Sequence, residues 1–452
     1  MTDTFPPSPD SSALPGAPLP VIAPTMGLLL TGGGARAAYQ VGVLEAIAQI
    51  RRDCGQSHGA NPFPILTGTS AGAINAAALA CGADQFDHAV RKLARVWSHL
   101  HAENVYHADA LSMLRSGARW LSMLSLGWAL TRWRSVHPRS LLDNAPLATL
   151  LQSELVPLAR LPTLVAQGHL RALSVTASSY STGEHVSFYE THAQLQPWVR
   201  SQRRAVSGHI SHAHLLASSA IPFIFPASPL DIDGHTEYFG DGSMRQTAPL
   251  APAIHLGADR VLVIGAGRMQ GPAENAAPLA PATYPTLAQI AGHTLSNIFL
   301  DALALDIERA QRVNATLTLI PPEARARSNL RTLELLVISP SQPLDAIAAR
   351  HMAGLPRSMR TLLRTLGVTT DASDTRGAAL ASYLLFEPEY TRALMALGRR
   401  DTFARREEVI QFFGWHASAA STRASAPARR TRGNGRKNPA TNPTPATSDA
   451  SH

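Results

Sequence analysis

The sequence contains few cysteines, and that scarcity excludes whole classes of fold. Among 452 residues only Cys54 and Cys81 are present. Two cysteines are too few for a framework stapled by disulfides, and their spacing matches no metal-ligand pattern. We therefore predict reduced thiols in a cytosol-like compartment, with no metal site and no cofactor.

Long apolar runs are also missing. None approaches the roughly 18 to 20 consecutive apolar residues needed to span a bilayer. The first residues carry Asp3 and Asp10 among prolines, in place of the basic start and apolar segment of a secretory signal. We predict a cytoplasmic protein whose contact with a membrane, where there is one, is peripheral.

Positive charge is in excess, but it is unevenly distributed. The formal net charge is +8. Much of this excess lies near the C-terminus, in Arg423, Arg429, Arg430, Arg432, Arg436 and Lys437. Because the rest of the chain is closer to neutral, we predict no nucleic-acid partner.

The chain has ample hydrophobic content for a core, at 45% of its residues. Its two ends differ from the middle. Residues 1–25 are dense in proline, and residues 415–452 are Ala, Ser, Thr, Pro and Arg with almost no large apolar side chain. We predict that both ends are disordered and that the folded body spans about 26–414.

Short apolar strands alternate with helices along this body. We predict strands at 26–31, 63–66, 170–178, 184–189, 236–240, 261–266, 316–320 and 334–339. We predict helices at 38–51, after the glycine at 72, and at 84–100, 209–219, 285–313, 356–366, 378–397 and 402–413. This alternation indicates an α/β fold of three layers, with a mostly parallel central sheet between helices. In such sheets, ligands collect beyond the carboxyl ends of the strands.

The stretch PFPILTGTSAGAINAAAL (62–79) is typical of a strand, a sharp turn and a helix, with Ser70 at the apex. Gly68 and Gly72 leave room for a tight, strained turn that holds the hydroxyl clear of the sheet. The helix that comes after it begins with unpaired N–H groups, which favour developing negative charge. The pentapeptide alone is weak evidence, because an ordinary N-capping serine produces the same letters.

Two further loops come after predicted strands and can converge on this turn. Gly32-Gly33-Gly34 comes after the first strand, and Asp241-Gly242-Ser243 comes after a later one. A serine needs a base to take its proton, and a tetrahedral intermediate needs N–H donors for its oxyanion. The glycine loop suits the donor role, Arg36 adds positive charge nearby, and Asp241 supplies the carboxylate.

Four blocks of sequence carry a resemblance to the patatin-like phospholipase family. They are TGGGARAAYQVGVLEAI (31–47), GTSAG (68–72), LLASSAIPFIFP (215–226) and the later Asp-Gly pair (241–242). Four blocks in this order are far more specific than any one of them. The resemblance implies a hydrolase-like α/β fold and a serine esterase of phospholipase A or lysophospholipase type, which cleaves acyl esters of lipids without a histidine.

Matched residue by residue, the resemblance implies Ser70 as the nucleophile and Asp241 as its base, with Gly68 and Gly72 shaping the elbow. We assign the oxyanion hole to Gly32, Gly33, Gly34, Ala35, Arg36 and Ala71. The implied substrate is a lipid, and no cofactor is implied.

The same resemblance implies a domain organisation. The catalytic domain is expected at about 26–325, with a lid-like insertion at about 101–150. Residues 326–414 resemble, less specifically, a mainly helical extension attached to some bacterial members. Ala37 and Ser243 depart from the family pattern, since glycine is usual at the first and glycine or alanine at the second. Both replacements are small.

Other classes of protein remain open. The loop from 32 to 37 has the pattern Gly-x-Gly-x-x-Ala, and Asp53 lies about twenty residues on, as in dinucleotide-binding oxidoreductases. However, Asp53 follows no second strand. A Ser-Asp-His hydrolase could use His255 or His293 downstream. A lipid-binding or scaffold protein with a degenerate site is the third alternative, against which the intact motifs argue.

Residues 111–134 combine tryptophan, leucine and arginine, with no acidic residue between them. This composition is typical of a helix at a membrane surface, because indole prefers the headgroup boundary and arginine meets anionic phosphate. A core helix packed on the body is the competing interpretation. Under the first interpretation we predict peripheral membrane contact through this segment. The sequence indicates no oligomeric state.

Overall fold

The structure is a computed structural model that describes residues 24–56, 61–107, 140–269, 284–325, 327–368 and 377–415. The two ends predicted to be disordered lie almost wholly outside these ranges. The segment 111–134, predicted to contact a membrane, also lies outside them.

The described strands form one mixed sheet. They are β1 (Met26–Leu30), β2 (Ile65–Thr69), β3 (Ala172–Ser179), β4 (His185–Thr191), β5 (Val199–Arg200), β6 (Arg203–Ser207), β7 (Ser228–Ile232), β8 (His235–Asp241), β9 (Arg260–Ile264) and β10 (Glu334–Ile338). Their order is β10-β9-β1-β2-β3-β4-β6-β5, with the β7–β8 hairpin attached to β3. Neighbours from β10 to β3 are parallel, whereas β4 and β8 run antiparallel to β3. The prediction of a mostly parallel sheet is confirmed.

Helices come after most of the strands. In the first half they are η1 (Gly34–Ala37), α1 (Ala38–Asp53), α2 (Ala71–Ala80), η2 (Ala83–Gln85), α3 (Phe86–Ser98), η3 (Ala102–Asn104), α5 (Ala145–Leu150), η4 (Leu151–Leu155), η5 (Leu158–Arg160), α6 (Leu161–Ala166) and α7 (His212–Ser218). In the second half they are η6 (Gly242–Arg245), α8 (Ala251–His255), α9 (Leu287–Thr318), α10 (Pro322–Arg325), α11 (Leu344–His351), η8 (Met352–Gly354), α12 (Arg357–Thr365), α13 (Ala378–Leu384), α14 (Pro388–Ala404) and α15 (Arg406–Phe413).

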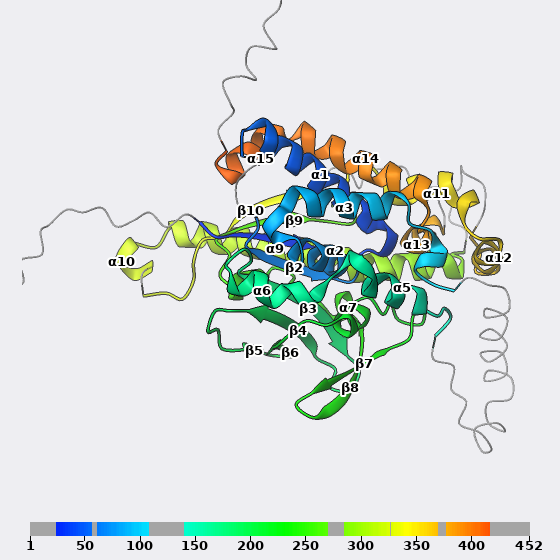
Figure 1. Cartoon of the computed structure of the whole chain (residues 1–452), viewed down its shortest axis with the longest axis horizontal. Coiled ribbons are helices and arrows are strands. Elements are labelled where there is room, and N and C mark those ends of the chain that lie inside the picture. The colour runs from blue at the N-terminus through cyan, green and yellow to red at the C-terminus, as the bar shows by residue number, and fades with distance from the viewer. Residues whose placement is uncertain are drawn as a thin grey trace, which may run out of the picture.

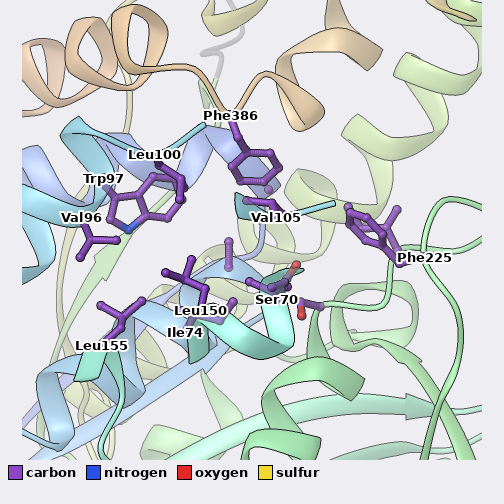
Figure 2. Close-up of a pocket in the computed structure, with 15 residues that line it drawn as sticks. Ser70, Ile74, Val96, Trp97, Leu100, Val105, Leu150, Leu155, Phe225 and Phe386 are labelled. Carbon is purple, nitrogen blue, oxygen red and sulfur yellow. The ribbon is translucent and has the colours of Figure 1, made fainter. Parts of the chain in front are cut away.

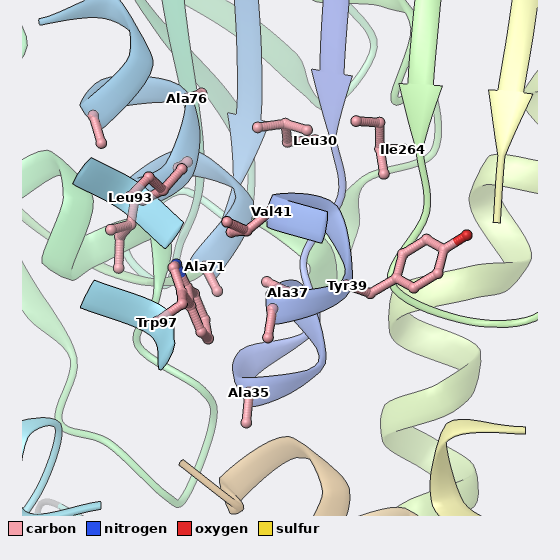
Figure 3. Close-up of a cluster of buried hydrophobic side chains, with 14 of the residues drawn as sticks. Leu30, Ala35, Ala37, Tyr39, Val41, Ala71, Ala76, Leu93, Trp97 and Ile264 are labelled. Carbon is pink, nitrogen blue, oxygen red and sulfur yellow. The ribbon is translucent and has the colours of Figure 1, made fainter. Parts of the chain in front are cut away.

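Helices cover both faces of the sheet, as predicted. Because successive side chains of a strand point to opposite faces, Leu28 and Leu30 of β1 join one apolar cluster and Leu29 joins another. The first cluster includes α1, α2, α3 and α14, which lie together on one side of the sheet in Figure 1. Figure 3 shows its small side chains, such as Ala37 and Ala76, which let these helices approach closely. The second cluster contains α8 and α9.

The strand predicted at 316–320 is wrong, because α9 runs through most of it. Threonine and isoleucine favour strands, but the leucines of this stretch suit a helix, and within α9 the threonine hydroxyls find acceptors. Thr316 Oγ1 donates to the Arg312 carbonyl at 2.9 Å, and Leu317 is fully buried. The edge position beside β9 is taken by β10 instead.

The single helix predicted at 378–397 is also wrong. It is broken into α13 and α14 by an extended segment that ends at Glu387 (φ −131°, ψ 141°). Pro388 opens α14, and a residue that precedes proline is pushed out of the helical region. The break turns Phe386 toward the interior, where it lines a cavity next to the Gly-x-Ser-x-Gly turn.

No helix in the described ranges is both long enough and apolar enough to cross a membrane. Cys54 and Cys81 are buried and unpaired.

Candidate active site

The Gly-x-Ser-x-Gly motif forms a sharp turn between β2 and α2. Ser70 has φ 56° and ψ −132°, a region that costs a non-glycine residue about 1–3 kcal/mol. Two hydrogen bonds hold it there. The Ser70 N–H donates to Ser218 Oγ at 2.8 Å, and the Ala73 N–H donates to the Ser70 carbonyl at 2.9 Å. Ser70 is 1% exposed, so its hydroxyl lies inside the protein.

Both glycines of the motif are required by close packing. A Cβ atom at Gly72 would run into the carbonyl oxygens of Leu30 and Thr31, at the end of β1. A Cβ atom at Gly68 would strike the backbone of α2, 2.6 Å from Ala73 Cα. The chain therefore passes from β2 into α2 through a turn that has no room for a side chain at either glycine.

Asp241 ends β8 and is 1% exposed. Its Oδ1 accepts a hydrogen bond from the Ser243 N–H at 2.9 Å, whereas its Oδ2 has no hydrogen-bond partner in the described part of the chain. Burial raises the pKa of Asp241 to about 6, and the hydroxyl of Ser70 and the N–H and hydroxyl of Ser243 partly offset that rise. The Ser70 hydroxyl thus lies beside this carboxyl, without a fully formed hydrogen bond between them.

Asp241 reaches the turn from an unexpected direction. The sequence suggested that all three loops come after the carboxyl ends of strands, as in a parallel sheet, but β8 is antiparallel to β3. Asp241 lies opposite Ala177, near the end of β3, and Thr176 of β3 lies opposite Thr69 of the elbow. Because β4 occupies the other edge of β3, β8 pairs with β3 on the same edge as β2, just past the point where β2 ends, and this brings the carboxyl next to Ser70.

The glycine loop lies at the same edge of the sheet. Gly32 and Gly33 are buried, and Gly34 has φ 54° with its α-carbon packed on the Tyr383 carbonyl. Gly34 and Ala71 both line the space next to the elbow serine. The N–H groups of Gly33, Gly34 and Ala71 donate to none of the described residues. Such N–H groups can bind an anionic oxygen.

Arg36 does not contribute its charge as predicted, because its side chain leaves the loop. Its Nε donates to Ser382 Oγ at 2.7 Å, and its guanidinium lies 4.0 Å from the centre of the Tyr383 ring. Ala35, which precedes it, is fully buried in η1. Arg36 therefore fastens the glycine loop to α13 and does not line the space beside the serine.

An apolar cavity of about 50 Å³ adjoins Ser70 (Figure 2). Its hydrophobic walls come from α2, α3, α5, η4, the loop after α7 and the break before α14, through Ile74, Val96, Trp97, Leu100, Val105, Leu147, Leu150, Leu155, Ile221, Phe225 and Phe386. A water molecule needs roughly 10–15 Å³ by this kind of measure, so the space holds only a few waters. An acyl chain would have to displace some of these side chains to enter.

Several supporting residues were not predicted from the sequence. Thr69 Oγ1 lies 2.7 Å from Thr176 Oγ1 and accepts from Gln246 Nε2 at 2.8 Å, which ties the elbow to β3 and to the loop after η6. Ser218 lies in the block 215–226, which resembles the patatin-like family, but the sequence alone did not indicate that this serine accepts a hydrogen bond from the elbow. Thr176 and Gln246 carried no signal in the sequence, because each acts only through tertiary contacts.

The residues of the competing interpretations lie elsewhere. His255 stacks on Trp198, with ring centres 4.6 Å apart, and lines a different cavity. His293 lines a third one. Neither histidine lines the cavity beside Ser70. Asp53 is the last residue of α1 and does not follow a strand, as a ribose-binding carboxylate would.

Comparisons with known proteins place the chain among its relatives. The chain is similar to the crystal structure of VipD from Legionella pneumophila, with 14% sequence identity over 82% of this chain and 67% of that chain, at a TM-score of 0.29. A search of curated proteins finds no match. The sequence profile described as patatin-like phospholipase matches residues 28–254, which is half of the chain. This protein belongs to the patatin-like phospholipase family.

Proposed function

We propose that this protein is a lipid acyl hydrolase in which Ser70 attacks the ester carbonyl and Asp241 takes the serine proton. The observation that carries the proposal is a serine on a strained elbow, beside a buried carboxyl whose pKa burial raises to about 6. Family membership supports the reaction class and the lipid nature of the substrate. The apolar walls of the adjoining cavity support an acyl chain as the group that is bound.

The proposed reaction proceeds in two steps, through an acyl-serine. Asp241 accepts the Ser70 proton as the serine oxygen bonds to the ester carbon, and the resulting oxyanion is stabilised by backbone N–H groups of Gly33, Gly34 and Ala71. The protonated Asp241 then donates to the leaving alcohol. Water, deprotonated by the same carboxylate, releases the fatty acid from the acyl-serine. The fixed N–H groups need no reorganisation, because the protein already holds them without acceptors among the described residues.

The positions of the histidines support a two-residue mechanism over a Ser-Asp-His triad. His255 is held between a tryptophan ring and other residues of a separate cavity, and no histidine of the described ranges lines the cavity beside Ser70. The contacts of the glycine loop weigh against a dinucleotide site. The α-carbon of Gly34 lies on the Tyr383 carbonyl, and that of Gly33 lies against Ala266, so a pyrophosphate has no room there.

Two parts of the proposed function remain predictions. Membrane contact through residues 111–134 concerns a segment outside the described residues. The domain boundaries at about 325 and 414, and the lid-like insertion at about 101–150, are likewise proposals. Val105 lines the cavity, and the Leu141 N–H bonds to the Phe223 carbonyl at 2.9 Å, so both flanks of the undescribed part lie near the proposed site.

Hydrolysis of a short acyl ester by single variants tests the assignment. Ser70→Ala is expected to reduce turnover to background, and Asp241→Asn to lower it by roughly two to four decades, the scale of a positioned base. His255→Ala, His293→Ala and the exposed-serine control Ser201→Ala are expected to retain turnover. Wild-type turnover in Ser70→Ala, or collapse in a folded histidine variant, would contradict the two-residue mechanism.

A further inference from the structure

A second cavity, of about 200 Å³, lies among β4, β6, α8 and α9. Trp198, which lines it, packs against the apolar cluster on the far side of the sheet from α1 and α2, whereas the apolar walls beside Ser70 belong to the near cluster. The two cavities share no lining residue. Its polar lining is dominated by basic groups, namely His185, Arg200, Arg203, His255 and Arg309, with Asp306 as the one carboxylate.

Positive charge in this cavity is not balanced from within. Asp306 is largely engaged already, since its Oδ2 accepts from the Leu250 N–H at 2.9 Å and its Oδ1 lies 3.7 Å from Arg309. The backbone of the partly buried Arg203 pairs within the sheet, but its guanidinium makes no hydrogen bond or ion pair with any described residue. Its charge acts on its neighbours, because Arg203 adds to the effect of burial in lowering the pKa of His185 and the pKa of His255, and it partly offsets the rise that burial causes in the pKa of Asp306. Three guanidinium groups therefore face one carboxylate.

His185 supplies a second and independent sign of a missing ligand. It is 3% exposed and lines the cavity, and its Nε2 has no hydrogen-bond partner among the described residues. A buried polar atom without a partner costs about 1–3 kcal/mol. Burial and the Arg203 charge lower the pKa of His185 to about 4, so the ring is neutral near pH 7 and can hydrogen-bond without adding charge.

The aromatic wall of the cavity limits what can bind. Trp198 stacks with Tyr189, at 5.1 Å between ring centres, and with His255, at 4.6 Å. The indole is therefore already engaged by two rings of the protein, which leaves less of its surface for a planar ring of a ligand. The groups left to bind a ligand are the arginines and the buried imidazole, and these groups suit a compact anion.

We propose that this cavity binds a phosphate group, either as free phosphate or as the monoester of a small molecule. Arginine is the side chain best matched to phosphate, because its planar fork donates two parallel hydrogen bonds. A phosphate oxygen also gives His185 Nε2 the partner that it lacks. The volume of about 200 Å³ is more than tenfold the roughly 10–15 Å³ that one water needs, so it accommodates a phosphate with a short organic group.

This site is independent of the proposed hydrolysis. It uses no residue of the elbow, the glycine loop or the Asp241 turn, and it lies among different elements. Ser70→Ala is therefore expected to bind phosphate as the wild type does. Failure of the hydrolase assignment would leave this proposal standing, and failure of phosphate binding would leave the hydrolase assignment standing.

Isothermal titration of the full-length chain at constant ionic strength tests the proposal. Inorganic phosphate and glycerol 3-phosphate serve as soluble probes, and phosphatidylcholine vesicles with and without phosphatidic acid serve as the lipid arm. Saturable heat with the soluble probes is expected, together with a rise in melting temperature that grows with probe concentration. Stronger binding of glycerol 3-phosphate would identify a monoester as the ligand, and equal binding would identify free phosphate. Heat from phosphatidic acid vesicles alone would overturn a small-molecule site.

Variants decide whether the binding occurs in this cavity. Arg203→Ala and Arg309→Ala are each expected to weaken binding by about tenfold, because each removes a charge-assisted contact. Arg312→Ala, an exposed position three residues further along α9, is the matched control and is expected to bind normally. Arg309 is itself exposed on a helix, so its replacement leaves folding intact even where Arg203→Ala does not. Unchanged binding in Arg309→Ala, or no saturable binding in the wild type, would overturn the proposal.

Discussion

At the residue scale, two locally unfavourable states lie side by side. Ser70 occupies a strained backbone conformation, and Asp241 carries a carboxyl where burial disfavours its charge. Packing alone requires neither residue. A glycine at position 70 would adopt this backbone conformation without strain, and an asparagine at position 241 would be buried without a charge. Strain and shifted pKa values gather where a protein has chemistry to perform, which is why these two positions support a functional site.

The raised pKa of Asp241 leads to a prediction about rate. A base must be ionised to accept a proton, so kcat/KM for a short acyl ester is expected to rise with pH and to level off above an apparent pKa of about 6. The measurement is a pH–rate profile between pH 4 and about 9. A rate that is flat through pH 6, or that falls as pH rises through it, would be inconsistent with Asp241 as the base.

The same carboxyl has the opposite effect on stability. The folded-state pKa of Asp241, about 6, lies above its ordinary value of 3.8, so the folded protein holds this proton more tightly than the unfolded chain does. Stability from this group is greatest below pH 3.8 and is lost as pH rises through 6. At pH 8 the ionised carboxyl costs up to about 3 kcal/mol. Asp241→Asn is expected to raise the unfolding free energy at pH 8, as urea denaturation can measure, with little change at pH 4.

At the element scale, the elbow depends on how closely α2 approaches β1. Gly72→Ala places a Cβ against the carbonyl oxygens of Leu30 and Thr31, so α2 must shift. Overpacking of this kind costs about 1–3 kcal/mol, and we expect ester hydrolysis to fall as well. Gly208→Ala is the control, because its Cβ meets no atom within 4 Å, and it is expected to change stability by less than about 0.5 kcal/mol. Equal denaturation midpoints for the two variants would show that the tight approach is not required.

The elements that were predictable are those with local signals. The apolar run before Gly68 and the alanines after Ser70 predicted β2 and α2, because burial on both faces leaves an unbroken hydrophobic pattern. The strand at 316–320 was wrong because threonine satisfied its hydroxyl within a helix. Strands β5, β6 and β7 were missed, since they are short and only one or two residues of β6 and of β7, and none of β5, are buried.

The sequence indicated which residues to examine for a site, but not how the fold brings them together. The sequence named Ser70, Asp241 and the glycine loop, and the structure brings them to one edge of the sheet. The antiparallel path of Asp241 and the inward position of Phe386 depend on pairings and breaks between distant segments. The direction of Arg36 depends likewise on α13, more than 340 residues away.

At the scale of the whole molecule, the C-terminal segment is built into the body. Strand β10 extends the central sheet beside β9, and α14 lies along α1 where Gly42 and Gly398 allow backbone contact. Arg399 pairs with Glu45 at 2.6 Å across the same junction. Phe386 also completes the cavity beside the serine. The proposed boundary at about 325 therefore separates sequence blocks that share one core.

A truncation at residue 325 tests this integration. Removing β10 and α14 exposes the edge of β9 and an apolar face of α1, so the shortened chain is expected to lose its cooperative thermal unfolding and its ester hydrolysis. Calorimetry and near-UV circular dichroism measure the loss. A chain ending at residue 415 is the control and is expected to match the wild type. Cooperative unfolding of the 1–325 chain at the wild-type temperature would show that the catalytic domain stands alone.

The central claim is that Ser70 is the nucleophile, and covalent labelling tests it most directly. A fluorophosphonate reacts only with an activated serine, so digestion and mass spectrometry of the labelled wild-type protein should find the probe on the peptide that contains Ser70. Labelling should disappear in Ser70→Ala and persist in Ser201→Ala. A label mapped to another serine, or persistent labelling of Ser70→Ala, would contradict the assignment of Ser70 as the nucleophile.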